Sequence, residues 1–110
     1  MSLARRAAMR DRNEPAIRRR AEALGYLWLP NSGKGRPDAC LLRDGRTFWC
    51  EVKMPGEPFT PDQMKTFPTL LAAGVPVYVL ERLEDVDSLR AGMLPAWRPE
   101  DVGAVVSRGR

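Results

Sequence analysis

The sequence predicts a single α/β domain in which a mixed sheet of about four strands is flanked by helices. Three features support this fold class. Apolar residues recur at helical spacing near the N-terminus and again after residue 60. An Asp-Gly pair separates two apolar runs, which is a strong hairpin signal. A mostly apolar run then follows the second helix, as expected for a strand buried between layers.

The first helix is expected from about Pro15 to Leu24, after a cap at Asn13 or Glu14 and before Gly25. Its inward stripe consists of Ile17, Ala21 and Leu24. Glu14 falls on the same stripe, seven residues before Ala21. Residues 1–12 are either a basic arm or an extension of this helix. A short strand, Tyr26–Pro30, should follow.

The middle of the sequence predicts a β-hairpin. Strands are expected at Asp38–Arg43 and Arg46–Lys53, joined by a two-residue turn at Asp44-Gly45. Such a turn sets Arg43 opposite Arg46, and the residue numbers of every facing pair then sum to 89. A three-residue bulged turn is the alternative, and it would shift one strand.

This register places two carboxylates and a lysine on one face of the hairpin. Asp38 lies across from Glu51, and Lys53 points the same way because it is two residues further along the strand. The other face is apolar and suits the core: Ala39, Leu41, Phe48, Cys50 and Val52. Cys40 and Cys50 fall on opposite faces, which argues against a disulfide between them.

The second half of the sequence predicts a helix, a strand and a further helix. The segment "TPDQ", Thr60–Gln63, is a capping box with proline at the first helical position, so a helix should run from there to about Ala73 and stop at Gly74. Pro68 should kink or split it. Its inner face is expected to carry Met64, Phe67 and Leu71. A strand at Val75–Glu81 and a short helix at Glu84–Arg90 come next. Residues 95–110 are assigned to no element.

Composition narrows the possible functions. The chain has no histidine and two cysteines, which excludes histidine-based zinc sites and triads and a disulfide scaffold. No apolar run approaches about 20 residues, and the N-terminus lacks the apolar region of a signal peptide, so we expect neither a membrane anchor nor secretion. Residues 1–20 carry seven arginines against two acids. Such a segment suits DNA or RNA, and equally a solvated arginine-rich helix.

The facing carboxylates need compensation, because two like charges repel in a low-dielectric site. A shared proton, a salt bridge to Lys53 or a divalent cation would each supply it. With magnesium on Asp38 and Glu51, a phosphodiester would be polarised and a bound water activated. Lys53 would then orient or deprotonate that water, or stabilise charge on phosphoryl oxygens. An ordinary surface salt bridge on an edge hairpin is the alternative.

The stretch "RPDACLLRDGRTFWCEVK" resembles the P-D…(D/E)-x-K signature of the PD-(D/E)xK nuclease superfamily, which has a restriction-endonuclease-like core. More narrowly, "NSGKGRPD", "CEVK" and "TPDQ" followed by "LLAAGVPVYVL" resemble the virus-type replication-repair nuclease domain, VRR-NUC, over Glu14 to Glu81. Stand-alone copies of this domain are typical of phages and prophages. The resemblance therefore implies the cytoplasm of a bacterial host.

The resemblance implies a site for Mg²⁺ or Mn²⁺. Asp38 and Glu51 match the metal-binding acids, and Val52 would lend its backbone carbonyl. Glu14 matches the acid that the first helix delivers to the site, where it would support a second metal or its waters. Its alternative role is that of an acid favoured at a helix N-terminus by the macrodipole.

Further roles follow from the same resemblance. Lys53 matches the catalytic lysine, and Gln63 matches a glutamine near the site, although the capping box alone also explains Gln63. Lys34 and Arg36 flank the site from the glycine-containing loop and are candidate phosphate contacts, unless that loop is merely solvated. This loop is not a P-loop, because Gly rather than Ser or Thr follows Lys34.

These implied roles add up to a DNA endonuclease that hydrolyses phosphodiesters with metal-activated water and leaves 5′-phosphate and 3′-hydroxyl ends. Because a chain of 110 residues offers little surface to grip a duplex, we expect a symmetric homodimer. Its paired sites would suit branched DNA such as a four-way (Holliday) junction. The alternatives are a nick- or flap-directed nuclease of the same family and a non-catalytic protein that binds nucleic acid through the basic N-terminus.

Overall fold

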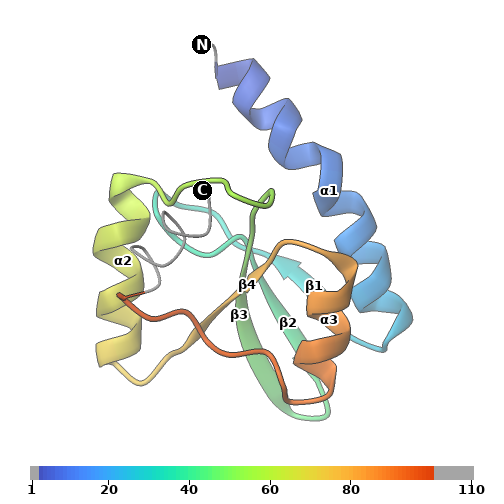
Figure 1. The fold of residues 1–110 in the computed structure, drawn as a ribbon. Coiled ribbons are helices and arrows are strands. Elements are labelled where there is room, and N and C mark those ends of the chain that lie inside the picture. Colours follow the sequence, from blue (N-terminus) through green and yellow to red (C-terminus); the bar gives the residue numbers. More distant parts are fainter. Residues whose placement is uncertain (1–2, 101–110) are drawn as a thin grey trace.

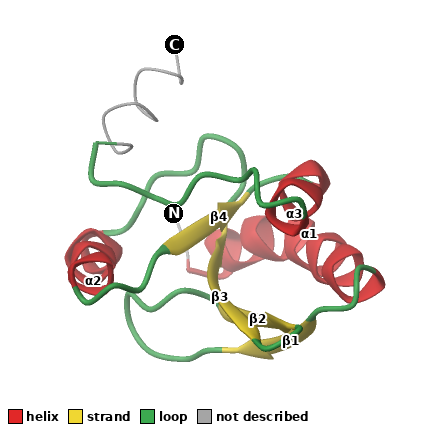
Figure 2. Ribbon diagram, turned by 90° about the horizontal axis from the view of Figure 1, so that it is seen from below, coloured by secondary structure: helices red, strands yellow, loops and turns green. Residues whose placement is uncertain are grey.

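The computed structural model describes the backbone of residues 3–100 and the side chains of residues 13–100. Four strands form one mixed sheet in the order β1-β2-β3-β4, and β4 runs parallel to β3 while the other pairs are antiparallel. Helices α1 and α3 lie on one side of the sheet and α2 on the other (Figures 1 and 2). The elements are α1 (Leu3–Ala23), β1 (Leu27–Pro30), β2 (Ala39–Arg43), β3 (Arg46–Val52), α2 (Pro61–Ala72), β4 (Val77–Leu80) and α3 (Leu83–Arg90). The predicted α/β class with a mixed sheet is confirmed.

Helix α1 begins at Leu3, before the predicted start at Pro15, so for residues 3–12 the helix-extension alternative holds. Residues 3–12 are rich in alanine and arginine, which are strong helix formers, and they extend the helix. Asn13 and Glu14 therefore lie inside α1 and do not cap it, so that prediction was wrong. Pro15 is also an interior residue. Because proline lacks an N–H, α1 continues through it with one helical hydrogen bond fewer.

The β2–β3 hairpin has the predicted register. Ala39 faces Cys50, and Arg43 faces Arg46 across a two-residue turn. Both turn residues have positive φ, +52° at Asp44 and +75° at Gly45, as the tight hairpin turn favoured by Asp-Gly requires. The bulged alternative is thereby excluded. Both cysteines are free thiols.

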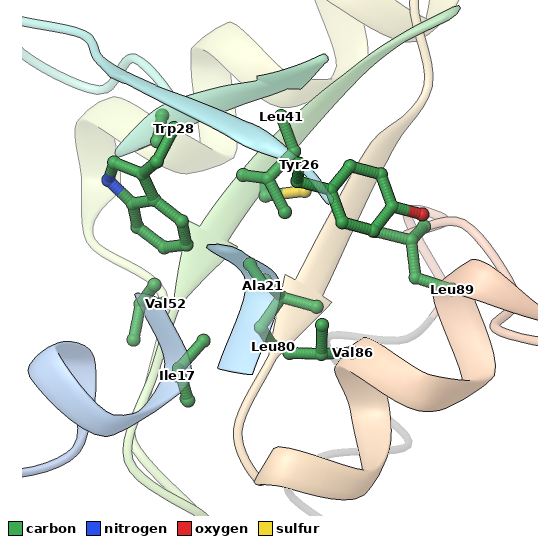
Figure 3. Packing of buried hydrophobic residues seen from close by; sticks show 11 residues of the cluster. Ile17, Ala21, Tyr26, Trp28, Leu41, Val52, Leu80, Val86 and Leu89 are labelled. Atoms are coloured by element: carbon green, nitrogen blue, oxygen red, sulfur yellow. The ribbon is translucent and has the colours of Figure 1, made fainter. Parts of the chain in front are cut away.

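The main core fills the space between the sheet and helices α1 and α3 (Figure 3). It contains Ile17, Ala21, Tyr26, Trp28, Ala39, Leu41, Cys50, Val52, Leu80, Val86 and Leu89. These residues include Ile17 and Ala21 of the predicted inner stripe of α1 and most of the predicted apolar face of the hairpin, while Leu24, the third residue of that stripe, is partly buried and packs against the cluster. Phe48, also predicted for that face, is partly buried and packs against the cluster.

A second, smaller cluster lies on the α2 side of the sheet and consists of Phe67, Val77 and Trp97. The rings of Phe67 and Trp97 meet edge to face with centroids 5.5 Å apart. The backbone N–H of Trp97 also donates to the Val77 carbonyl at 2.7 Å. Trp97, which the sequence left unplaced, thus closes this side of the domain. Residues 101–110 lie outside the described residues.

Helix α2 differs from its prediction in the face that it turns inward. Gln63 and Phe67 are buried and Leu70 packs on the second cluster, whereas Met64 and Leu71 are exposed. Positions 63, 67 and 70 follow the helical repeat, so the inner stripe is real but displaced by about one residue. Pro68 does not split the helix, since α2 runs unbroken from Pro61 to Ala72.

The last two elements lie close to their predicted positions. Strand β4 is shorter than predicted, and α3 begins one residue earlier. Within residues 3–100, none of the helices combines the length and apolar composition that a membrane crossing requires.

Candidate active site

The candidate site lies where β2 begins and where the parallel strands β3 and β4 end. Asp38 directly precedes β2, and continuing the register by one pair sets it opposite Glu51. The Asp38 carboxylate is tied to β3, because its Oδ2 accepts a hydrogen bond from the Val52 N–H at 2.8 Å. The structure therefore brings Asp38 to the segment that carries Glu51 and Lys53, as the hairpin register predicts.

Glu51, Lys53 and Gln63 form a buried polar network on the α2 side of β3. The Gln63 Nε2 donates to Glu51 Oε2 at 2.7 Å, and the Lys53 ammonium donates to Gln63 Oε1 at 2.8 Å. Lys53 Nζ also lies 3.8 Å from Glu51 Oε2. Glu51 is 0% exposed and Lys53 2%. Gln63 thus joins the carboxylate and the ammonium that the resemblance assigns to catalysis.

Neighbouring groups complete the surroundings of the Lys53 ammonium. Nζ donates to the Pro58 carbonyl at 3.0 Å and lies 3.7 Å from Glu57 Oε2. It also stands 5.1 Å from the centre of the Phe59 ring. Burying a charge is costly unless it is paired and hydrogen-bonded, and these contacts from the segment before α2 meet that requirement.

The orientation of the Gln63 amide follows from its hydrogen-bond partners. Its Oε1 accepts from the Thr60 N–H at 2.9 Å as well as from the Lys53 ammonium, and both of these groups are donors. The amide nitrogen, which is a donor, must therefore face the Glu51 carboxylate. Gln63 completes the capping box of α2 and contacts the site at the same time, so the capping box does not fully explain it.

Helix α1 is fastened to the same end of the sheet by Asn13. Its Nδ2 donates to the Lys53 carbonyl at 2.9 Å and to the Glu81 carbonyl at 3.2 Å, which bridges the ends of β3 and β4. Glu14 is the next residue along α1 and is half-buried. Sequence reasoning missed this role of Asn13, since an asparagine before Pro15 looks like a helix cap.

The donor set at the site suits a hard divalent cation. Asp38 and Glu51 offer carboxylate oxygens and Val52 a backbone carbonyl, and Mg²⁺ is commonly held by one or two carboxylates together with waters and substrate phosphates. No group of three or more acidic or cysteine side chains able to hold a metal ion occurs among the side chains described. Glu14 therefore does not join Asp38 and Glu51 in a three-carboxylate cluster in this structure.

The loop that carries Lys34 and Arg36 packs against the first turns of α2. Gly35 has φ +75°, and a Cβ there would lie 2.6 Å from the Asp62 carbonyl oxygen, so only glycine fits. The side chains of Lys34 and Arg36 are exposed. Their role in phosphate binding stays a prediction.

Two comparisons with known proteins, by family model and with curated sequences, find no match. The fold, however, is similar to a solved structure described as a VRR_NUC domain. The TM-score is 0.62 and the sequence identity 28%, and the match covers 76% of this chain and 95% of that one. The resemblance predicted from the sequence motifs is therefore confirmed, and the fold of this chain is that of a VRR-NUC domain of the PD-(D/E)xK type.

Proposed function

We propose that this protein is a divalent-metal-dependent DNA endonuclease. The observation that carries the proposal is the buried Glu51–Gln63–Lys53 network beside Asp38, found in a domain whose fold is similar to a VRR_NUC structure. Two charged side chains that are buried at a strand end and joined by one amide are unusual for a surface salt bridge. They are typical of a site that orients groups for chemistry.

In this proposal Asp38 and Glu51 hold Mg²⁺ or Mn²⁺ together with the Val52 carbonyl. The cation supplies Lewis-acid polarisation of the phosphodiester and a lowered pKa of bound water. Gln63 acts as a positioning residue, because its amide sets the direction of the Glu51 carboxylate. Glu14 would support the site from α1, through the metal's waters or a second ion, with Asn13 fixing that helix in place.

Lys53 is proposed to orient or deprotonate the attacking water, or to stabilise charge on the phosphoryl oxygens. Its ammonium is 2% exposed and donates to Pro58 and Gln63. To contact substrate, the Lys53 ammonium has to give up one of these hydrogen bonds. We propose that it releases the bond to the Pro58 carbonyl and keeps the bond to Gln63. Residues 54–59 would then move aside when DNA binds, while Lys34 and Arg36 would hold flanking phosphates.

We further propose that the preferred substrate is branched DNA, in particular a four-way junction, cut by a symmetric homodimer with two sites. The support for this refinement is the small size of the domain, which offers limited surface for gripping a duplex. Direction towards a nick or flap, or binding without cleavage through the basic N-terminus, are the competing outcomes that the experiment has to separate.

A cleavage assay on labelled four-way junction, flap, nicked and linear DNA tests the proposal. We expect cutting with Mg²⁺ or Mn²⁺, none with EDTA, and loss of cutting without loss of binding in Asp38→Ala. Binding to all four substrates without cleavage in either metal would contradict the nuclease assignment. Cleavage of the flap or nicked substrate alone would show that the four-way junction is not the preferred substrate. A monomeric mass in solution would contradict the proposed homodimer.

A further inference from the structure

A second candidate site lies at the opposite end of the sheet, where the β2–β3 turn meets the C-terminal end of α3 (Figure 1). A pocket of about 570 Å³ opens there, within the range of roughly 300–1,000 Å³ that small-molecule sites occupy. Arg46 lines this pocket, and Glu51 of the candidate active site is five residues further along β3. At about 3.3 Å per residue, the two sites are about 17 Å apart.

Part of the pocket lining is strongly cationic. Arg43, Arg46 and Arg90 line it together with a single acid, Asp44. Arg43 is already engaged, since it forms an ion pair with Asp44 and donates to the Leu24 carbonyl at 3.0 Å. Among residues 13–100, Arg46 and Arg90 form neither an ion pair nor a side-chain hydrogen bond with the protein. Two guanidinium groups are thus available to an anion.

The arrangement of Arg43 and Arg46 is costly for the hairpin itself. They face each other directly across the turn, and like charges in facing positions destabilise an antiparallel pair. Asp44 neutralises one of them. In the part of the chain that the structure describes, Arg46 is left without an opposite charge, and a local arrangement that opposes stability in this way is more often found at a functional site than elsewhere.

Aromatic residues form another part of the lining. The rings of Tyr26, Phe48 and Tyr78 form a chain of edge-to-face contacts with centroid distances of 6.1 and 5.7 Å. Burial raises the pKa of Tyr26, and the three nearby arginines oppose that shift. The Tyr26 side chain is therefore a neutral phenol at physiological pH, able to donate a hydrogen bond. The pocket thus joins cationic donors to a wall of aromatic rings.

We propose that this pocket binds a nucleotide, with the phosphate held by Arg46 and Arg90 and the base against the aromatic wall. Guanidinium groups match phosphate oxygens in pairs, and aromatic rings accept the planar face or edge of a base. The nucleotide is either a free nucleoside phosphate or an unpaired nucleotide of a DNA strand. The site is separate from Asp38, Glu51 and Lys53, so binding there does not depend on the proposed nuclease activity.

Nuclear magnetic resonance titrations of the full chain in EDTA test this proposal. The probes are deoxyadenosine monophosphate, deoxyadenosine, inorganic phosphate and a short oligothymidylate. We expect the monophosphate, the oligonucleotide or both to shift the amides of residues 43–48 and 90–92 and to bind at least tenfold tighter than deoxyadenosine or phosphate alone. A response to the monophosphate identifies a free nucleotide as sufficient, and a response to the oligonucleotide alone identifies a DNA strand. Shifts confined to residues 51–63, equal affinity for phosphate and nucleotide, or no shifts would each overturn the proposal.

The substitution Arg46→Gln gives a second test, in which nucleotide affinity and thermal stability should change in opposite directions. It should weaken nucleotide binding at least tenfold and raise the thermal unfolding midpoint, because the facing-arginine repulsion is relieved. Lys65→Gln is the matched control, since it removes one positive charge from an exposed position of α2 and should change neither quantity. Unchanged nucleotide affinity in Arg46→Gln would overturn the proposal. Cleavage is not a readout in either experiment, so failure here leaves the proposed nuclease function standing.

Discussion

The two faces of β3 are buried to the same degree but built from opposite chemistry. Cys50 and Val52 point into the main core and are 0% and 1% exposed. Glu51 and Lys53, which alternate with them, are 0% and 2% exposed on the other side of the sheet. The comparison teaches that burial alone does not identify a core position in this domain. The two faces differ in the residues that they contact: one packs in the apolar core, and the other forms the polar network with Gln63.

The energetic consequences of the two faces differ as well. Removing an apolar side chain from water stabilises the fold by about 1.5–3 kcal/mol, so the first face contributes directly to stability. A buried ion pair contributes little net stability, because desolvation offsets the attraction, yet breaking it by removing one partner is strongly destabilising. The second face therefore adds little net stability, although its contacts fix the relative positions of Glu51, Lys53 and Gln63.

The largest expected difference between the faces is in catalysis. Lys53→Met should reduce cleavage by about 100- to 10,000-fold, because it removes the amino group that the proposal assigns to the attacking water or to the phosphoryl oxygens. Cys50→Ala, on the other face, should leave cleavage within a few-fold of wild type below its unfolding temperature. Steady-state cleavage of the preferred DNA measures the loss of catalysis in each variant. Binding of the same DNA in EDTA shows whether the variant still recognises its substrate. If Lys53→Met cut DNA at the normal rate, the role assigned to Lys53 would be wrong.

The next largest effect should be on stability, at the residue that satisfies the polar face. Gln63→Ala removes the amide between Lys53 and Glu51 and one half of the capping box, and we expect a loss of about 3 kcal/mol. Urea unfolding followed by circular dichroism measures it. Met64→Ala, at the neighbouring exposed position of the same helix, should change stability by about 0.5 kcal/mol or less. Equal losses in the two variants would show that the network contributes nothing.

A smaller effect on stability should distinguish the helix cap of α2 from the candidate active site. Thr60→Ala removes the hydroxyl that accepts the Gln63 N–H, and it should cost about 1 kcal/mol. The Thr60 backbone N–H remains and still donates to Gln63 Oε1, so the direction of the amide is kept. Cleavage by this variant should therefore match wild type in the assay above. A loss of activity comparable to that of Lys53→Met would mean that the cap hydroxyl orients the site.

The smallest perturbation is alkylation of the two cysteines, which tests whether Cys40 and Cys50 lie on opposite faces of the hairpin and needs no substitution. Cys40 is half-buried and Cys50 fully buried, and burial raises the pKa of the Cys50 thiol well above its ordinary value. Because the thiolate is the reactive form, Cys50 should resist alkylation throughout the pH range in which the protein stays folded. Treatment with iodoacetamide at pH 8 and mass analysis should find Cys40 labelled first and Cys50 labelled only in denaturant. Rapid labelling of Cys50 in the folded chain would contradict the register.

The sequence by itself determined the hairpin and the start of α2. Asp44-Gly45 specifies a two-residue turn, and the turn sets the register through which Asp38, Glu51 and Lys53 come to one end and one side of the sheet. The capping box specifies where α2 begins. These features could be predicted because each depends on the backbone preferences of a few adjacent residues and on the two-residue period of a strand.

The tertiary structure alone decided which way α2 faces and what Asn13 and Trp97 do. Gln63 turns inward because Lys53 and Glu51, ten and twelve residues earlier, offer it a donor and an acceptor. Asn13 bonds to carbonyls 40 and 68 residues away, and Trp97 covers a cluster that includes Val77. No local propensity encodes such contacts, because they exist only once the strands have been brought together and a buried polar group or apolar face requires a partner.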